Sequence, residues 1–237
     1  MDAVNAEEIT AFLQGNMSPS FAQTGEDLIV RFLLDRMRVS QPTYLDIGAN
    51  HPVLLNNTMH FCLAGSRGIN IEPNRNLWEL LQKFRPRDIN LNMGIGETAG
   101  ELTYYEMSNH TANSFSREFA ERMEQMGAAK IVRTSVVPVA PVWQILDQYS
   151  DAEGCPDFVN IDAEGIDEIV LRTFPFAQRQ PKVICIETMS YDADGRWVKE
   201  TGARAILEKQ GYILYADTYI NSIFVRHQMM PYLKGNG

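Results

Sequence analysis

The feature that most constrains the fold is a series of short apolar runs that alternate with helix-like segments. The apolar runs lie at 43–47, 68–71, 89–93, 158–161, 183–186, 212–216 and 220–225. The first five are apolar over nearly their whole length, which is typical of parallel strands buried on both faces. Helical patterns lie between them at about 56–65, 75–84, 165–173 and 198–210. This alternation predicts a doubly wound α/β sheet with helices on both faces.

The end and the middle of the chain depart from simple alternation. Only Asp217, Thr218 and Tyr219 separate the last two runs. A parallel crossover needs a dozen residues or more, so these runs must form a C-terminal antiparallel hairpin. Residues of about 97–150 form an insertion, for which we expect strands at 102–106 and 131–139 and helices at 115–126 and 142–149.

The length of the chain allows one domain or, as the less favoured alternative, two, and we expect one domain preceded by a short extension. We expect a helix over about 6–14 in an N-terminal helical extension, residues 1–20. Residues 21–237 then form a single domain whose core covers about 43–226. A second helix is expected to begin near Thr24, because Thr24 and Asp27 approximate a capping box.

Charge and cysteine content limit the partners and the compartment. The formal charge is −9 and the pI about 5.0, with no cluster of lysine and arginine, so we expect neither a nucleic acid nor a membrane surface as partner. No apolar run approaches the roughly 18–20 residues of a spanning helix. Cys62, Cys155 and Cys185 are odd in number and lack CxxC spacing, which favours buried thiols in a reducing cytoplasm. The oligomeric state is left open.

Acidic and small polar residues follow four of the predicted strands. Ligands of an open α/β sheet bind at the carboxyl ends of its strands, so these residues mark the expected site. They are Asp46, Gly48 and Asn50 after the first strand, Glu72 after the second, Asp162, Glu164 and Gly165 after the fourth, and Glu187 after the fifth. A carboxylate at the end of the second strand can accept two hydrogen bonds from a ribose diol.

The charge of this site favours a cationic nucleoside. Glu72 follows Asp46 by 26 residues, comparable to the roughly 20 of dinucleotide folds, but the phosphate-binding pattern GxGxxG is missing. A pyrophosphate would also meet carboxylates here. S-adenosylmethionine carries a sulfonium and an ammonium group and is the better electrostatic match. The alternative is that Asp46 only caps a buried turn.

Several motifs in series resemble one known family. LDIGAN, HPVLLNNT and RGINIEPN, with FAQTGEDLIV before them and INLNMGIGE, FVNIDAEGIDEIVLRTF and KVICIET after them, resemble the FkbM-type family of S-adenosylmethionine-dependent methyltransferases. The resemblance covers about residues 21–190. It implies a Rossmann-like, seven-stranded class I methyltransferase sheet, which accounts independently for the terminal hairpin.

The resemblance also implies roles for individual residues. Asp46, Gly48 and Asn50 match the loop that wraps the methionine part of the cofactor, and Glu72 matches the residue that holds the ribose. Asn92 falls where such folds line the adenine. Asp162 matches the strand end that faces the ammonium group and the transferring methyl. Gln23, Glu26 and Asp27 match an upstream element in which Ala22 replaces the usual serine.

Methyl transfer to oxygen needs positioning and a base for the hydroxyl proton. Candidate catalytic residues are His51, His110 and Asp162, although binding the ammonium group would lower the pKa of Asp162 and conflict with a role as base. A metal-assisted alternative would use Asp162, Glu164, Glu187 and His51 as ligands of a divalent cation such as Mg²⁺. The polar segment around 109–116 is a candidate substrate lid.

The leading hypothesis is an S-adenosylmethionine-dependent O-methyltransferase that acts on a hydroxyl of a small molecule or carbohydrate. One alternative is a protein that binds this cofactor without catalysis. A weaker alternative is a nicotinamide-dependent oxidoreductase, against which the missing GxGxxG and the terminal hairpin argue.

Overall fold

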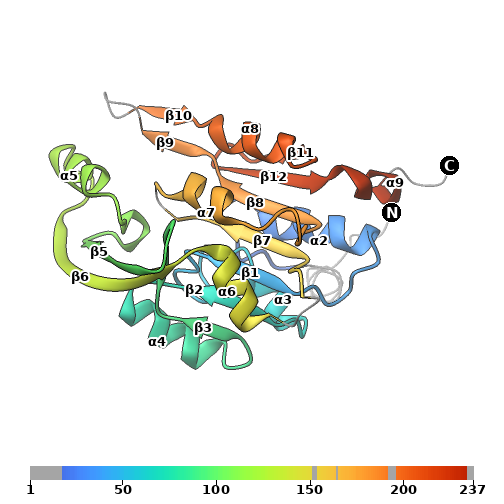
Figure 1. The fold of residues 1–237 in the computed structure, drawn as a ribbon, viewed down its shortest axis with the longest axis horizontal. Coiled ribbons are helices and arrows are strands. Elements are labelled where there is room, and N and C mark those ends of the chain that lie inside the picture. Colours follow the sequence, from blue (N-terminus) through green and yellow to red (C-terminus); the bar gives the residue numbers. More distant parts are fainter. Residues whose placement is uncertain (1–17, 151–153, 164, 192–195, 234–237) are drawn as a thin grey trace, which may run out of the picture.

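The computed structural model describes residues 18–150, 154–163, 165–191 and 196–233. Its centre is a seven-stranded sheet in the order β11-β12-β8-β7-β1-β2-β3 (Figure 1). The strands are β1 (Tyr44–Ile47), β2 (Gly68–Ile71), β3 (Ile89–Leu91), β7 (Phe158–Ile161), β8 (Val183–Glu187), β11 (Tyr212–Asp217) and β12 (Asn221–Arg226). The first five of these pair in parallel, whereas β12 is antiparallel to both neighbours. The predicted sheet and C-terminal hairpin are therefore confirmed.

The central strands are mostly apolar because both faces of the sheet are covered. Every residue of β1 and β7 is buried. Leu45 and Val159 belong to one core cluster, which includes side chains of α6 (Val142–Tyr149), α7 (Asp167–Thr173) and α8 (Gly202–Lys209). Tyr44 and Phe158 belong to a second cluster with α2 (Glu26–Arg36) and α3 (Met59–Leu63). Alternate residues of one strand thus point into different cores.

Two helix starts differ from the prediction because side chains have other partners. α2 begins at Glu26 after Gly25, and no side chain caps it, so the capping box at Thr24 is wrong. The Asp27 carboxylate instead accepts hydrogen bonds from Ser20 and Phe21, at 2.6 and 2.7 Å. α3 begins at residue 59 rather than 56, because the Asn56 side chain accepts from the backbone N–H groups of residues 58 and 59.

The other helices predicted around the main sheet are also present, and two of them begin later than predicted. α4 (Arg75–Phe84) has the predicted bounds, and the Asn74 side chain caps it. α7 begins two residues later than predicted. α8 begins at Gly202, so the predicted start at residue 198 is wrong: β10 (Trp197–Lys199) pairs there with β9 (Met189–Tyr191). The chain then continues after β12 into η2 (His227–Met229) and α9 (Met230–Leu233). The helix predicted at 6–14 lies outside the described residues.

The insertion, together with β4 directly before it, forms a second, smaller sheet beside the main one (Figure 1). Its strands are β4 (Gly94–Ile95), β5 (Gly100–Met107) and β6 (Ile131–Ala140), in the order β4-β6-β5. Between β5 and β6 lie the short helix η1 (His110–Ala112) and α5 (Arg117–Gln125). The four elements expected in this insertion are therefore present. No helix within the described ranges is long and apolar enough to cross a membrane.

Candidate functional site

A cavity of about 690 Å³ opens at the carboxyl ends of β1, β2, β7 and β8. This volume falls within the roughly 300–1,000 Å³ usual for small-molecule sites. Its inner floor, at the strand ends, includes the carboxyl groups of Asp46, Glu72, Asp162 and Glu187. Its outer wall comes from the insertion and from β9 and β10, and includes Tyr104, Asn109, His110, Thr111, Asn113, Phe115, Met189, Ser190 and Trp197.

The loop after β1 approaches the end of β7 so closely that only glycine fits. Gly48 has φ +76°, and a Cβ atom placed on it would lie 1.7 Å from the carbonyl oxygen of Asp162. The N–H groups of Gly48 and Ala49 both donate to the carbonyl of Ile71. The glycine therefore lets the loop close between the ends of β2 and β7 and leaves room for a ligand above it.

Glu72 lies at the end of β2 and is 3% exposed. Its Oε2 accepts from the backbone N–H of Asn50 and its Oε1 from that of Asn74, both at 2.7 Å. Burial raises the pKa of Glu72 to about 7, although these two N–H donors oppose the rise. Each carboxylate oxygen has a second lone pair, so Glu72 can still accept hydrogen bonds from two hydroxyl groups in the cavity.

Asp46 is bound within the protein rather than left for a ligand. One oxygen accepts from the Thr58 hydroxyl at 2.6 Å and the other from the Asn160 amide at 2.9 Å. Thr58 in turn accepts from the guanidinium of Arg85, which is fully buried. Burial raises the pKa of Asp46, while the two donors and the Arg85 charge act in the opposite direction. Asp46 therefore lines the cavity but also holds the loop to the sheet.

A relay of amides that starts at Asp46 fixes the orientation of Asn57. Asn160 must turn its Nδ2 toward Asp46, so its Oδ1 accepts from Asn57 Nδ2 at 2.8 Å. Asn57 Oδ1 is then left as an acceptor. It is buried and has no partner within the described part of the chain, and the same holds for Asn50 Oδ1. Both residues line the cavity.

Asp162 and Glu187 form a carboxyl pair at the ends of β7 and β8. Their carboxyl groups lie within hydrogen-bonding distance of each other, and burial, together with Asp167 and Asp46, raises the pKa of Asp162 to about 7. Two carboxyl groups can bond in this way only if one of them holds a proton. From the sequence, Glu187 was expected at a strand end and as a candidate metal ligand. Its pairing with Asp162 was not predicted.

His51 follows the β1 loop and is oriented by the backbone. Its Nδ1 accepts from the N–H groups of Val53 and Leu54 at 3.2 and 3.0 Å. The neutral ring therefore carries its hydrogen on Nε2 and is a donor there rather than a base. Burial, with the nearby His110, lowers the pKa of His51. His110 lies in η1, and both histidines line the cavity.

The remaining predicted residues do not all reach the cavity. Asn92 is not among its lining residues: its amide donates to the carbonyls of Glu72 and Pro73, each at 2.9 Å. Gln23 lines the cavity, whereas Glu26 is buried and bound to Thr218 and Asn221 on the far hairpin.

The proposed metal ligands are only partly brought together. Asp162, Glu187 and His51 all line the cavity. Glu164 lies outside the described residues. Within the described residues, no group of three or more acidic, histidine or cysteine side chains could hold a metal ion.

The carboxyl groups and amide oxygens that line the cavity fit S-adenosylmethionine. The carboxyl pair and the unpaired acceptors suit its positive charges and its amino group, and Glu72 suits its ribose hydroxyls. Gly48 provides the close approach that such a ligand needs.

Comparison with solved structures finds several distant likenesses. Similar solved structures include a candidate caffeoyl-CoA O-methyltransferase from Staphylococcus aureus (12% identity, 93% of this chain and 91% of that chain, TM-score 0.44). Others are magnesium protoporphyrin IX methyltransferase from Synechocystis PCC 6803 with bound S-adenosylmethionine (12%, 94% and 92%, 0.39) and precorrin-6y C5,15-methyltransferase from Geobacter metallireducens (15%, 88% and 92%, 0.42). These likenesses are too distant to carry an argument about function. Comparison with curated proteins found no match.

The family assignment comes from the sequence model of the FkbM methyltransferase domain, which matches residues 46–214. These residues contain the β1 loop, Glu72 and the carboxyl pair. The match also covers β2, β7, β8 and the second half of β1. The chain therefore belongs to the FkbM family of S-adenosylmethionine-dependent methyltransferases.

Proposed function

We propose that the protein transfers the methyl group of S-adenosylmethionine to a hydroxyl group of an uncharged small molecule or sugar. The observation that carries this proposal is the chemistry of the outer wall. Its described residues offer amides, hydroxyls, imidazole and aromatic rings, but no lysine, arginine, aspartate or glutamate. Such groups suit a neutral acceptor with hydroxyls to bind and apolar faces to pack.

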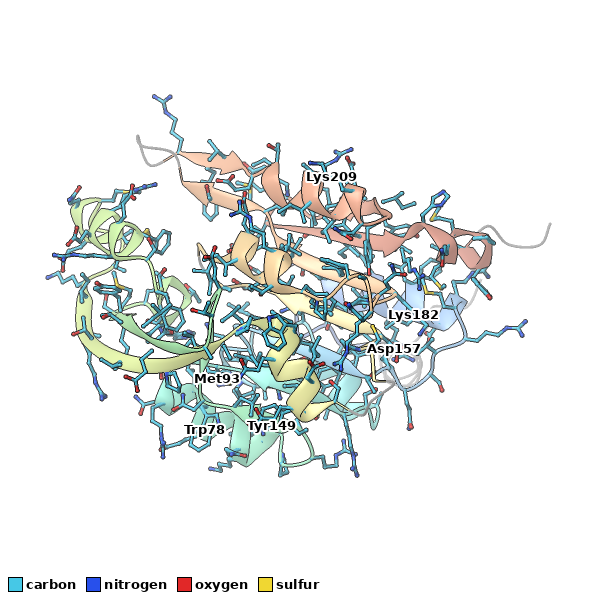
Figure 2. All side chains as sticks on the ribbon, in the orientation of Figure 1. Trp78, Met93, Tyr149, Asp157, Lys182 and Lys209 are labelled. Carbon is cyan, nitrogen blue, oxygen red and sulfur yellow. The ribbon has the colours of Figure 1, made fainter. Side chains whose placement is uncertain are left out.

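The described lining of the cavity supports a neutral acceptor, because it contains no basic side chain. No lysine or arginine is among the described residues that line it. The segments outside the described residues contain a single basic side chain, Lys234. Basic residues near the main sheet have partners elsewhere: Lys182 pairs with Asp157 at the amino ends of β8 and β7 (Figure 2), and Arg85 pairs with Asp88. A phosphate or carboxylate group would find no counter-charge here.

Free donors on the outer wall support a hydroxylated acceptor. The side-chain amides of Asn109 and Asn113 use Oδ1 to accept from the backbone N–H groups of Thr111 and Met107, at 3.2 and 2.7 Å. Within the described residues their Nδ2 groups have no partner, so each can donate to a hydroxyl oxygen. This fits the expectation that the segment around 109–116 covers the substrate.

The mechanism we propose is an in-line displacement. When bound, S-adenosylmethionine supplies a methyl group whose bond to sulfur breaks as its bond to the hydroxyl oxygen forms. The carboxyl pair is the proton acceptor we favour. The pKa of Asp162 is about 7 without a ligand and is lowered by a bound cationic cofactor. Because the transfer removes the sulfonium charge, the pair can then take up the hydroxyl proton. His51 would donate a hydrogen bond from Nε2 to the acceptor molecule. Positioning by the β1 loop and the outer wall would supply much of the acceleration.

Two experiments test the proposal. Titration calorimetry with S-adenosylmethionine and with NAD tests the cofactor, and we expect heat with the first only. Release of S-adenosylhomocysteine is then measured with paired acceptors, neutral sugars and polyols against their phosphates, with and without EDTA. Turnover of phosphates alone would contradict the proposed acceptor. Loss of turnover on chelation would favour the metal-assisted alternative. Binding without turnover on any hydroxylated acceptor would favour a cofactor-binding protein.

A nicotinamide-dependent oxidoreductase is the weaker candidate. Dinucleotide folds place the pyrophosphate at a helix N-terminus directly after the first strand. Here α3 begins at Met59, well after the end of β1 at Ile47. We also propose that the protein works in the cytoplasm, because Cys62, Cys155 and Cys185 are all free thiols.

A further inference from the structure

The side chain of Asn57 lines the cavity, although no sequence pattern marked it as a site residue. It is 6% exposed. Its Nδ2 donates to Asn160 Oδ1 at 2.8 Å and makes a longer contact with Cys185 Sγ at 3.9 Å. These partners belong to β7 and β8, so the nitrogen of the amide faces the main sheet. Its Oδ1 is buried and has no partner within the described residues, which leaves it as a hydrogen-bond acceptor for a ligand.

A chain of hydrogen bonds connects this oxygen to the charge of Asp46. Asp46 accepts from Asn160 Nδ2 at 2.9 Å, and Asn160 Oδ1 accepts in turn from Asn57. The charge of Arg85 favours the ionised form of Asp46. Hydrogen bonds in such a chain polarise one another, so each amide that donates toward the carboxylate becomes a stronger acceptor at its own oxygen. The negative charge of Asp46 is therefore extended in part to Asn57 Oδ1.

The backbone on both sides of Asn57 is fixed by contacts that need no ligand. The N–H of Asn56 donates to the carbonyl of Phe21 at 2.8 Å. The Asn56 side chain accepts from the N–H groups of Thr58 and Met59, at 3.0 and 2.7 Å. The amide of Asn57 therefore loses little freedom when a ligand binds. A buried acceptor without a donor is unfavourable, and a ligand that supplies the donor removes this cost.

The chemistry of the methyl donor indicates which of its groups belongs here. An amide oxygen pairs with an N–H or O–H group, and the sulfonium has neither. Glu72 at the end of β2 suits the ribose hydroxyls, whereas Asn57 contacts β7 and β8, and β1 separates these strands from β2. Asp46 and Asp162 line the cavity at the ends of β1 and β7. A charged ammonium group suits these carboxyl groups better than the uncharged amino group of adenine does.

We propose that Asn57 binds the ammonium group of S-adenosylmethionine through its side-chain oxygen. The inference rests on the proposed function, because it takes this cofactor as the ligand. Methyl transfer leaves the ammonium group unchanged. The contact should therefore hold S-adenosylmethionine and S-adenosylhomocysteine alike, and Asn57 is a cofactor-binding residue rather than a catalytic one.

The test removes the amino group from the ligand and the oxygen from the protein. Titration calorimetry at neutral pH compares S-adenosylhomocysteine with its deamino analogue, in which a carboxypropyl chain replaces the amino-acid chain. Both are thioethers, so the sulfonium charge plays no part. We expect the unmodified protein to bind S-adenosylhomocysteine at least about tenfold more tightly. In Asn57→Leu, which replaces the amide by an apolar group of similar size, this ratio should fall about tenfold, which is about 1.4 kcal/mol.

Two further variants separate binding from folding. Asn70→Leu makes the same change in a buried amide of β2 whose Oδ1 also has no partner in the described part of the chain. Asn70 is not among the residues that line the cavity, so this variant should leave the ratio unchanged. Asn57→Ala removes the same oxygen with a smaller side chain and should lower the ratio as Asn57→Leu does. Thermal unfolding of each variant checks that the fold is intact.

The outcomes separate this inference from the proposed function. An equal loss of affinity for both ligands in the two Asn57 variants would overturn the inference, because Asn57 would then act only on the shape of the loop. Equal affinities of the unmodified protein for both ligands would also overturn it. So would unchanged cofactor affinity in Asn57→Leu with a raised KM for the hydroxyl acceptor. If neither S-adenosylmethionine nor S-adenosylhomocysteine binds the unmodified protein, the cofactor of the proposed function is refuted, and this inference with it.

Discussion

Replacing Gly48 by alanine tests how the β1 loop makes the cofactor site. The residue combines two restrictions, a φ of +76° and a Cβ position 1.7 Å from the carbonyl oxygen of Asp162. The structure offers a control for each restriction. Gly211 has φ +84° and nothing within 4 Å of its Cβ position, and Gly100 has open space and no positive φ. The three alanine variants therefore form a graded series.

The magnitude follows from the geometry. A non-glycine residue in the left-handed region costs about 1–2 kcal/mol. At Gly48 the neighbour is backbone, which must move by more than about 1 Å, so we expect a loss of about 3–5 kcal/mol in the free energy of unfolding. At about 2–4 °C per kcal/mol for a chain of this size, the Tm of Gly48→Ala should fall by about 10 °C or more. Gly211→Ala should lose about 5 °C and Gly100→Ala almost nothing.

The assay pairs thermal unfolding with calorimetric titration of S-adenosylhomocysteine. We expect cofactor affinity to fall at least about tenfold in Gly48→Ala only, because the loop must separate from the end of β7. The reasoning would be refuted if Gly48→Ala matched Gly211→Ala in Tm and bound the ligand normally. That result would mean that the loop can move without cost, and that the contact with Asp162 does not shape the site.

Three further predictions concern titratable residues of the site. Burial raises the pKa of Glu72 from 4.5 to about 7, so the unfolded chain binds fewer protons than the native one between these values. The contribution of Glu72 to stability should fall as pH rises through this window, by about 3 kcal/mol at most, and Glu72→Gln should flatten this slope in thermal unfolding. Arg85→Met should cost about 3–5 kcal/mol by leaving Asp88 buried without its ion pair, and adding Asp88→Asn should recover part of the loss in Tm. His51→Ala should keep cofactor affinity and leave the acidic limb of the pH profile of kcat/KM unchanged, because backbone N–H groups already donate to Nδ1. Loss of that limb would show that His51 acts as the base.

The sheet was predictable because its signal is local and repeated. Runs such as 158–161 and 183–186 are apolar over nearly their whole length, since both faces are buried. The short link of residues 217–219 excluded a parallel crossover before β12. By contrast, β9 and β10 have three residues each, too few to show a period, so the start of α8 was placed too early.

The hydrogen-bond partners of the site residues were not predictable, because these partners are distant in the sequence. Asp46 meets Asn160, 114 residues further on. The pairing of Asp162 with Glu187 depends on the register of β7 against β8. The sequence gives the residue types at the strand ends, but only the register decides which carboxyl group already has donors within the protein.

That distinction changes the meaning of the acidic strand ends. All four carboxyl groups of the inner floor look alike in the sequence, yet they differ in how many donors the protein supplies. Both oxygens of Asp46 receive side-chain donors, and both oxygens of Glu72 receive backbone N–H groups. Asp162 instead faces a second carboxyl group, Glu187. Because two adjacent carboxyl groups ionise together only beside a cation, the positive charge of the cofactor should be felt more strongly at this pair than at Asp46.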